Sequence, residues 1–217
     1  IGFKQKVNID ASVACVKEAD VVVFAGGISP LLEGEEMGVN LPGFKGGDRT
    51  DIELPAVQRE LIHALHRAGK KIILVNCSGS PIALEPETKN CEAILQAWYP
   101  GQAGGTAVAD VLFGDYNPGG RLPVTFYRSM SQLPDFENYN MTGRTYRYMT
   151  QQPLFPFGYG LSYTTFEYGN LSLAKEQIKV GEPLKLTVNV TNNGQRDGEE
   201  VVQVYLKKQD DAEGPGK

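Results

Sequence analysis

The stretch Asp20-Val-Val-Val-Phe-Ala25, followed by Gly26-Gly27, decides the class of fold that we predict. The run is continuously apolar rather than alternating, which is typical of a strand buried on both faces of a parallel sheet. Lys71-Ile-Ile-Leu-Val-Asn76 shows the same pattern, and we expect a third strand over residues 92–98. These strands predict an α/β domain in which helices cover the sheet.

Two helices are predicted beside these strands. Pro55 suits the first position of a helix, where its missing N–H group costs nothing, and Gly69 marks the end of the same helix. Between them, apolar residues recur on one face: Val57, Leu61, Ile62, Leu65 and Ala68. We expect the second helix over residues 101–112, where small residues allow close packing. The alternation of strands and helices predicts a mostly parallel sheet in an α/β sandwich.

The pattern changes after Gly114. Residues 116–162 are rich in proline, glycine and aromatic residues and have no clear period, so we expect an ordered connection held by aromatic packing. From Thr165 onward, apolar and polar residues alternate, which predicts strands over residues 166–173, 184–190 and 200–207. An immunoglobulin-type sandwich needs about seven strands. We therefore expect only part of a β-sandwich.

Together, these patterns divide the chain into three parts. We predict an α/β sandwich domain over residues 1–128, a connection over 129–164 and an incomplete β-sandwich over 165–217.

Composition argues against several functions. The 217 residues carry 21 basic and 26 acidic side chains, a net charge of -5, which does not suit a nucleic-acid partner. The longest apolar stretch, residues 19–25, is too short to cross a bilayer, so we expect no membrane partner. Three scattered cysteines do not predict a disulfide scaffold. His63 and His66 lack a third ligand nearby, and we expect no metal or other cofactor.

An acidic, glycine-rich loop follows the first strand. Glu33-Gly-Glu-Glu36 and then Gly46-Gly-Asp-Arg49 lie past the carboxyl end of that strand, where ligands bind in open α/β sheets. Crowded carboxylates retain a proton more readily, which suits a general acid. A solvated acidic loop, with Asp48 and Arg49 as a local ion pair, explains the same residues. Spacing alone favours this second interpretation.

Several longer segments resemble a known family. Pro100-Gly-Gln-Ala-Gly-Gly105, Pro153-Leu-Phe-Pro-Phe-Gly-Tyr-Gly-Leu-Ser-Tyr163 and residues 110–126 and 143–148 are similar to hallmark segments of glycoside hydrolase family 3. The resemblance is to the branch of bacterial β-xylosidases and β-glucosidases. It implies a (β/α)8-like barrel, then an α/β sandwich domain, then often a fibronectin type III-like domain. We expect this chain to lack the barrel and the catalytic Asp that the family carries there.

The resemblance also implies which residue is the acid/base. The family often places a Glu in a loop ahead of a Gly/Asp-Arg segment, and Glu33-Gly-Glu35 ahead of Gly47-Asp-Arg49 matches that layout. We predict Glu35, because the family's Glu-x-Glu arrangement most often aligns its acid with the second Glu. Glu33 is the second candidate and Glu36 the third. In a retaining glycosidase the two carboxyl groups lie about 5–5.5 Å apart, so this Glu would act only with the barrel docked.

We therefore predict a fragment of a retaining exo-acting β-glycosidase that removes terminal xylose or glucose from oligosaccharides. Its partners would be the oligosaccharide and the barrel domain of the same polypeptide, and the resemblance implies a periplasmic or secreted location. The fragment alone should be inactive. The alternative is a non-catalytic carbohydrate-binding or scaffolding module with an aromatic platform. An exposed row of Tyr146, Tyr148, Phe155 and Tyr159 would favour that alternative, whereas we expect these rings to be buried.

Overall fold

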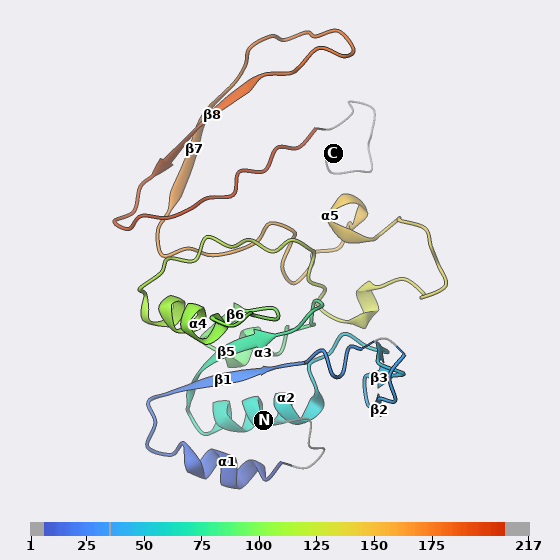
Figure 1. The fold of residues 1–217 in the computed structure, drawn as a ribbon, viewed down its shortest axis with the longest axis vertical. Coiled ribbons are helices and arrows are strands. Elements are labelled where there is room, and N and C mark those ends of the chain that lie inside the picture. Colours follow the sequence, from blue (N-terminus) through green and yellow to red (C-terminus); the bar gives the residue numbers. More distant parts are fainter. Residues whose placement is uncertain (1–6, 35, 207–217) are drawn as a thin grey trace. The chain divides into compact units, whose positions relative to one another are not determined.

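The computed structural model describes residues 7–34 and 36–206 (Figure 1). The chain separates into two compact units. The α/β unit takes its described residues from Ile1–Gly105, Pro123–Phe157 and Tyr205–Lys217. The hairpin unit consists of Thr106–Leu122 and Gly158–Val204. The predicted boundaries near residues 128 and 164 stay a prediction.

A parallel sheet forms the centre of the α/β unit, as predicted. Its strands are β1 (Val21–Gly27), β5 (Lys71–Cys77) and β6 (Ala93–Gln96), in the order β1-β5-β6. Figure 1 shows β1 and β5 side by side over their full length, in register from Val21 opposite Lys71 to Gly27 opposite Cys77. The carboxyl ends of all three strands therefore lie at one edge of the sheet.

Helix α2 (Ala56–Arg67) packs against this sheet, and α1 (Ile9–Cys15) packs against α2. The predicted helix over 55–69 is confirmed, since Pro55 precedes its first residue and Gly69 follows its last turn with a φ of 74°. A short helix, α3 (Glu87–Asn90), lies between β5 and β6. The core consists of Phe24, Ile28, Leu32, Phe44, Leu54, Leu61, Ile62, Leu65, Ile72, Leu74, Ile82 and Leu84. Burial of each large side chain contributes about 1.5–3 kcal/mol.

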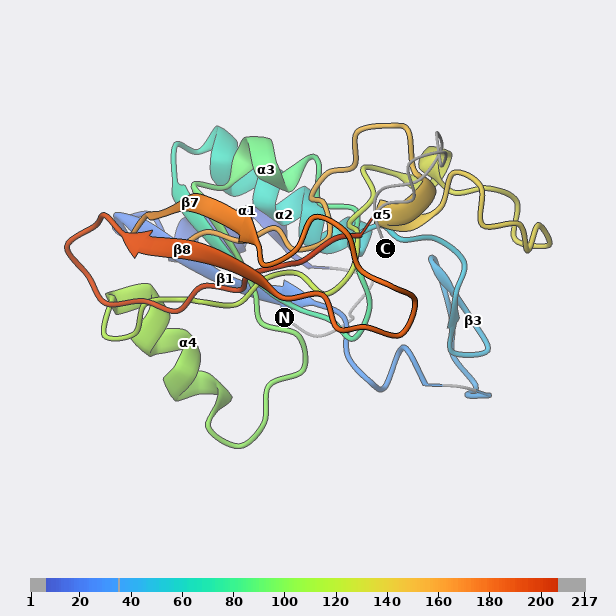
Figure 2. The ribbon, with the colours of Figure 1, turned by 90° about the horizontal axis from the view of Figure 1, so that it is seen from above.

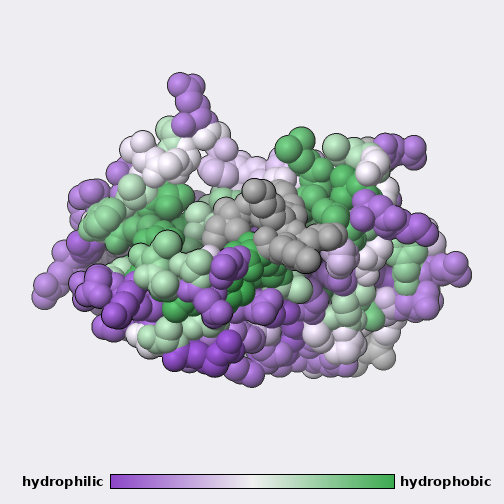
Figure 3. Space-filling view, turned by 90° about the horizontal axis from the view of Figure 1, so that it is seen from below, coloured by the Kyte–Doolittle hydropathy of each residue, from purple (hydrophilic) through white to green (hydrophobic). Residues whose placement is uncertain are grey.

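The prediction that β1 is buried on both faces is wrong for the described residues. Val21 is 45% exposed and Val23 is 54% exposed, whereas Phe24 is buried. β1 is an edge strand of the three-stranded sheet, and alternate side chains of a strand point to opposite faces. Apolar residues also reach the surface elsewhere, as the hydrophobic patches in Figure 3 show.

A small antiparallel sheet interrupts the loop between β1 and α2. It consists of β2 (Asn40–Leu41), β3 (Phe44–Lys45) and β4 (Asp48–Arg49). Gly47, which precedes β4, has a φ of 91°, and a Cβ atom there would lie 1.4 Å from the Gly34 carbonyl oxygen. Only glycine permits this close approach, which brings β4 against the start of the acidic loop.

The hairpin unit contains most of α4 (Gly104–Phe113) and the strands β7 (Phe166–Leu173) and β8 (Leu186–Asn192). The two strands pair antiparallel and run side by side in both Figure 1 and Figure 2. The predicted third strand is wrong for residues 200–206, which form none, and Lys207 lies outside the described residues. A strand needs a partner backbone for its ladder. Here side chains hold Glu200 instead, which pairs with Arg121 at 2.7 Å and accepts from Tyr168 at 2.9 Å.

Two short helical segments follow α4 in the sequence and belong to the α/β unit: η1 (Met130–Gln132) and α5 (Thr145–Tyr148). The buried Phe126 ring meets Trp98 and Phe155 edge to face, with centroids 6.1 and 6.4 Å apart. Among the described residues, no helix is both long enough and apolar enough to cross a membrane.

Candidate active site

The candidate site lies where the loop after β1 meets the loop after β5. Ile28 extends the sheet by donating to the Cys77 carbonyl at 2.8 Å, and the chain then turns so that the Glu33 N–H donates to the Ser29 carbonyl at 3.1 Å. This turn brings Glu33 to the carboxyl edge of the sheet. Glu35, the first candidate from the sequence, lies outside the described residues. Glu36 is exposed.

The Glu33 carboxylate accepts three hydrogen bonds. One oxygen, Oε2, accepts from the Gly79 N–H at 3.1 Å and from the Tyr99 hydroxyl. The other oxygen, Oε1, accepts from the Ser80 hydroxyl. The donors come from loops that follow two different strands, so folding of the sheet fixes the carboxylate in one position.

Arg49 approaches the same group from β4. Its guanidinium donates to Ser80 Oγ at 3.1 Å, to the Pro81 carbonyl at 3.4 Å and to the Glu53 carbonyl at 3.2 Å. Its Nε atom is buried and has no hydrogen-bond partner among the described residues. Burial lowers the pKa of Arg49, and Glu33 opposes this effect.

The predicted ion pair between Asp48 and Arg49 does not form. The two residues are neighbours in β4, so their side chains point to opposite faces of the strand. Asp48 is exposed, while Arg49 is half-buried against Ser80 and the backbone. The acidic loop is therefore more than a solvated rim, because it is tied to the loop that follows β5.

A cavity of about 420 Å³ opens at this cluster. Its polar lining includes Glu33, Asp48, Arg49, Ser80 and Tyr127, and apolar groups such as Ile82 and Leu133 complete it. A carboxylate, a guanidinium and hydroxyls on an apolar floor can bind a ligand rich in hydroxyl groups. The carboxylate can also exchange a proton with such a ligand.

The loop after β5 has its own buried support. Asn76 and Ser78 are fully buried, and Gln96 bridges them by accepting from Asn76 Nδ2 at 2.6 Å and donating to Ser78 Oγ at 3.1 Å. This network holds the segment that presents Gly79 and Ser80 to Glu33. Local sequence patterns give no signal for this network or for the contact of Tyr99 with Glu33.

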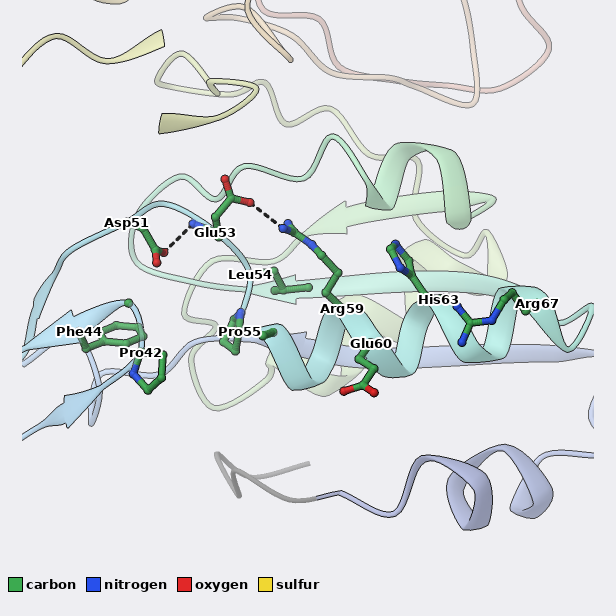
Figure 4. A pocket seen from close by; sticks show the side chains of 12 residues that line it. Pro42, Phe44, Asp51, Glu53, Leu54, Pro55, Arg59, Glu60, His63 and Arg67 are labelled. Carbon is green, nitrogen blue, oxygen red and sulfur yellow. Dashed lines mark hydrogen bonds and ion pairs between the residues drawn. The ribbon is translucent and has the colours of Figure 1, made fainter. Parts of the chain in front are cut away.

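A second cavity, of about 470 Å³, lies beside α2 and is shown in Figure 4. Arg59 lines this cavity. Its guanidinium forms ion pairs with Glu87 at 2.8 Å and with Glu53 at 2.7 Å, and it donates to the Ala83 carbonyl at 2.9 Å. Burial would lower the pKa of Arg59, but Glu87 and Glu53 outweigh it and raise the pKa. These charges tie α2, α3 and the preceding loop together, and we assign them a structural role.

The aromatic side chains do not form a flat platform. Tyr146 stacks on Phe157 with centroids 4.5 Å apart, whereas Phe155 meets Phe126 at an interplanar angle of 60°. The expectation that these rings are buried is nevertheless wrong for Tyr146 and Tyr159, which are 37% and 38% exposed. Tyr148 and Phe155 are half-buried. Tyr146 and Phe155 thus contact different neighbouring rings, at different interplanar angles.

Comparison with known proteins identifies relatives along the whole chain. The chain is 58% identical to a xylan 1,4-β-xylosidase of Xylanibacter ruminicola over 99% of its own length and 25% of that protein. It is 42% identical to a periplasmic β-glucosidase of Salmonella typhimurium, over 92% of its own length and 26% of that protein. The chain thus spans about a quarter of the length of these curated relatives.

Solved structures show the same fold. A β-glucosidase of Erythrobacter marinus matches 96% of this chain and 27% of its own chain, with a TM-score of 0.80 and 38% identity. A β-glucosidase of Listeria innocua in complex with glucose matches 100% of this chain and 31% of its own, with a TM-score of 0.77 and 30% identity. The model of the glycosyl hydrolase family 3 C-terminal domain matches residues 2–163. This match covers well over half of the sequence, and the chain therefore belongs to the glycosyl hydrolase family 3 C-terminal domain family.

Proposed function

We propose that this chain is the part of a retaining exo-acting β-glycosidase that supplies the general acid/base. The substrate would be an oligosaccharide with a terminal β-linked xylose or glucose. The names of the relatives, xylan 1,4-β-xylosidase and periplasmic β-glucosidase, support this substrate class and a periplasmic or secreted location. The observation that carries the proposal is the Glu33 carboxylate, which is held at the carboxyl edge of a parallel sheet beside a cavity.

Among the three candidate glutamates, we assign the acid/base role to Glu33. A catalytic carboxyl group must be fixed relative to the bond that breaks, and Glu33 is fixed by three donors from two loops. Two of these donors are hydroxyls, of Ser80 and Tyr99. A hydroxyl can donate or accept, so both contacts can persist when the carboxyl group gains or loses a proton. Glu35 is the competing assignment.

In the proposed reaction, Glu33 first protonates the oxygen of the leaving group while a second carboxylate attacks the sugar. It then takes a proton from the water that hydrolyses the glycosyl-enzyme intermediate. The second carboxylate would be an Asp of a barrel domain belonging to the whole protein. We further propose that the β7–β8 hairpin is the start of a fibronectin type III-like domain. The 217-residue chain alone should be inactive.

The test uses a chimera in which residues 1–217 replace the matching quarter of the Xylanibacter ruminicola relative. Glu33→Ala and Glu35→Ala are compared on aryl β-xylosides and β-glucosides, with and without azide, and the exposed Glu18→Gln variant is the control. We expect Glu33→Ala alone to lose about 10²–10⁴-fold in activity. Azide, which replaces the water in the second step, should restore part of it on an activated substrate.

Rescue of Glu35→Ala instead would move the assignment by two residues and retain the proposed function. Full activity in both variants would overturn the proposal that this loop supplies the acid/base.

A further inference from the structure

We propose that Tyr99 and Ser80 are positioning residues for Glu33, and that Ser80 links the carboxylate to the charge of Arg49. This inference rests on the proposed acid/base role of Glu33. The two hydroxyls contact different oxygens of the carboxylate, Oε2 for Tyr99 and Oε1 for Ser80. Together they fix both the position and the rotation of the group.

Tyr99 is directed to Glu33 by an unusual backbone. It follows β6, and Trp98 between them has a φ of 55°, a conformation that is uncommon for a bulky residue. Burial and the hydrogen bond to Glu33 both raise the pKa of Tyr99. Its phenol therefore keeps its proton throughout the neutral range and stays available as a donor.

Gly79 lets the two side chains come together. A Cβ atom at this position would lie 2.7 Å from the Tyr99 ring and 3.0 Å from Glu33 Oε2. The distance to the ring is shorter than real Cβ contacts allow, so a side chain at position 79 would push Tyr99 away. The absence of a side chain also lets the Gly79 N–H reach the carboxylate at 3.1 Å.

The Ser80 hydroxyl connects the Arg49 guanidinium to the Glu33 carboxylate. Its Oγ accepts from the Arg49 guanidinium at 3.1 Å and donates to Glu33. A hydroxyl polarised by a cation is a stronger donor, so Arg49 acts on Glu33 through Ser80. The arrangement leaves Arg49 Nε without a partner among the described residues, on a side chain that lines the same cavity.

The leaving-group dependence of the chimera distinguishes positioning from a structural role. Protonation by the acid matters for a poor leaving group such as phenol and little for 2,4-dinitrophenol. For Tyr99→Phe we expect kcat/KM to fall about tenfold on phenyl β-xyloside, a part of what a general acid contributes, and less than about twofold on the dinitrophenyl substrate. Ser80→Ala should show the same selectivity, and Ser80→Thr, which keeps the hydroxyl, should restore activity.

Tyr168→Phe is the matched control, because it removes a hydroxyl that donates to a different carboxylate, that of Glu200 in the hairpin unit. Tyr168→Phe should leave kcat/KM unchanged on both substrates. Thermal unfolding of each variant excludes a loss of folded protein. An equal loss on both substrates, or no loss on phenyl β-xyloside, would overturn the positioning role. If Glu33→Ala itself shows no dependence on the leaving group, the assignment of the acid/base to Glu33 fails, and the positioning role fails with it.

Discussion

Two arginines of the α/β unit, Arg49 and Arg59, both lie close to glutamates, yet their guanidinium groups are satisfied differently. Arg59 makes a two-point ion pair with the fully buried Glu87, with atoms 2.8 and 3.1 Å apart, and a second pair with Glu53. Arg49 binds neutral oxygens and keeps a buried Nε atom without a partner among the described residues. Matched charges indicate a structural tie, whereas an incompletely satisfied cation beside a cavity indicates a site.

The largest effect on stability should come from breaking the matched pair. Arg59→Met leaves the Glu87 carboxylate buried and unpaired, which should destabilise the chain by about 3–5 kcal/mol. Urea denaturation of the 217-residue chain measures this change. A loss below about 1 kcal/mol would mean that the pair does not tie α2 to α3.

The double variant Arg59→Met, Glu87→Leu separates the effect of charge from that of packing. Because it removes both charges and fills the space with apolar groups, it should recover most of the stability lost in Arg59→Met, to within about 1–2 kcal/mol of the parent. Urea denaturation of the double variant measures this recovery. A double variant as unstable as the single one would show that packing, not charge, dominates at this position.

Arg49→Met should have a smaller effect on stability, about 1 kcal/mol, because the charge is already partly desolvated and its partners are neutral. In the chimera, Arg49→Met should nevertheless reduce activity on phenyl β-xyloside more than Arg59→Met does, when both activities are expressed per amount of folded protein. Parallel denaturation and rate measurements on the two variants test this reversal of order. The same ranking in both experiments would contradict the division between structural and functional arginines.

Local patterns were sufficient to predict β1, β5 and α2. Pro55 and Gly69 mark the two ends of α2, and the apolar runs identify the strands. The exposure of Val21 and Val23 was not predictable, because it depends on which strands and helices are neighbours.

The acidic loop after β1 stays a predicted site, and Glu33 was among its candidates. The hydrogen-bond partners of Glu33 were not predicted, because Gly79, Ser80 and Tyr99 lie 46, 47 and 66 residues further along the chain. Contacts at such separations depend on strand order, which a single sequence does not reveal. The Asp48–Arg49 pair failed for a simpler reason, since adjacent residues of a strand diverge.

We propose that Glu33, held by Tyr99, Ser80 and Gly79, is the acid/base of the complete enzyme. The most direct measurement is the product formed by the Glu33→Ala chimera from an activated β-xyloside in the presence of azide. We expect a xylosyl azide with retained β configuration, formed by Glu33→Ala and not by Glu35→Ala, because azide takes the place of the water that Glu33 activates. Formation of the azide by Glu35→Ala alone would contradict the claim.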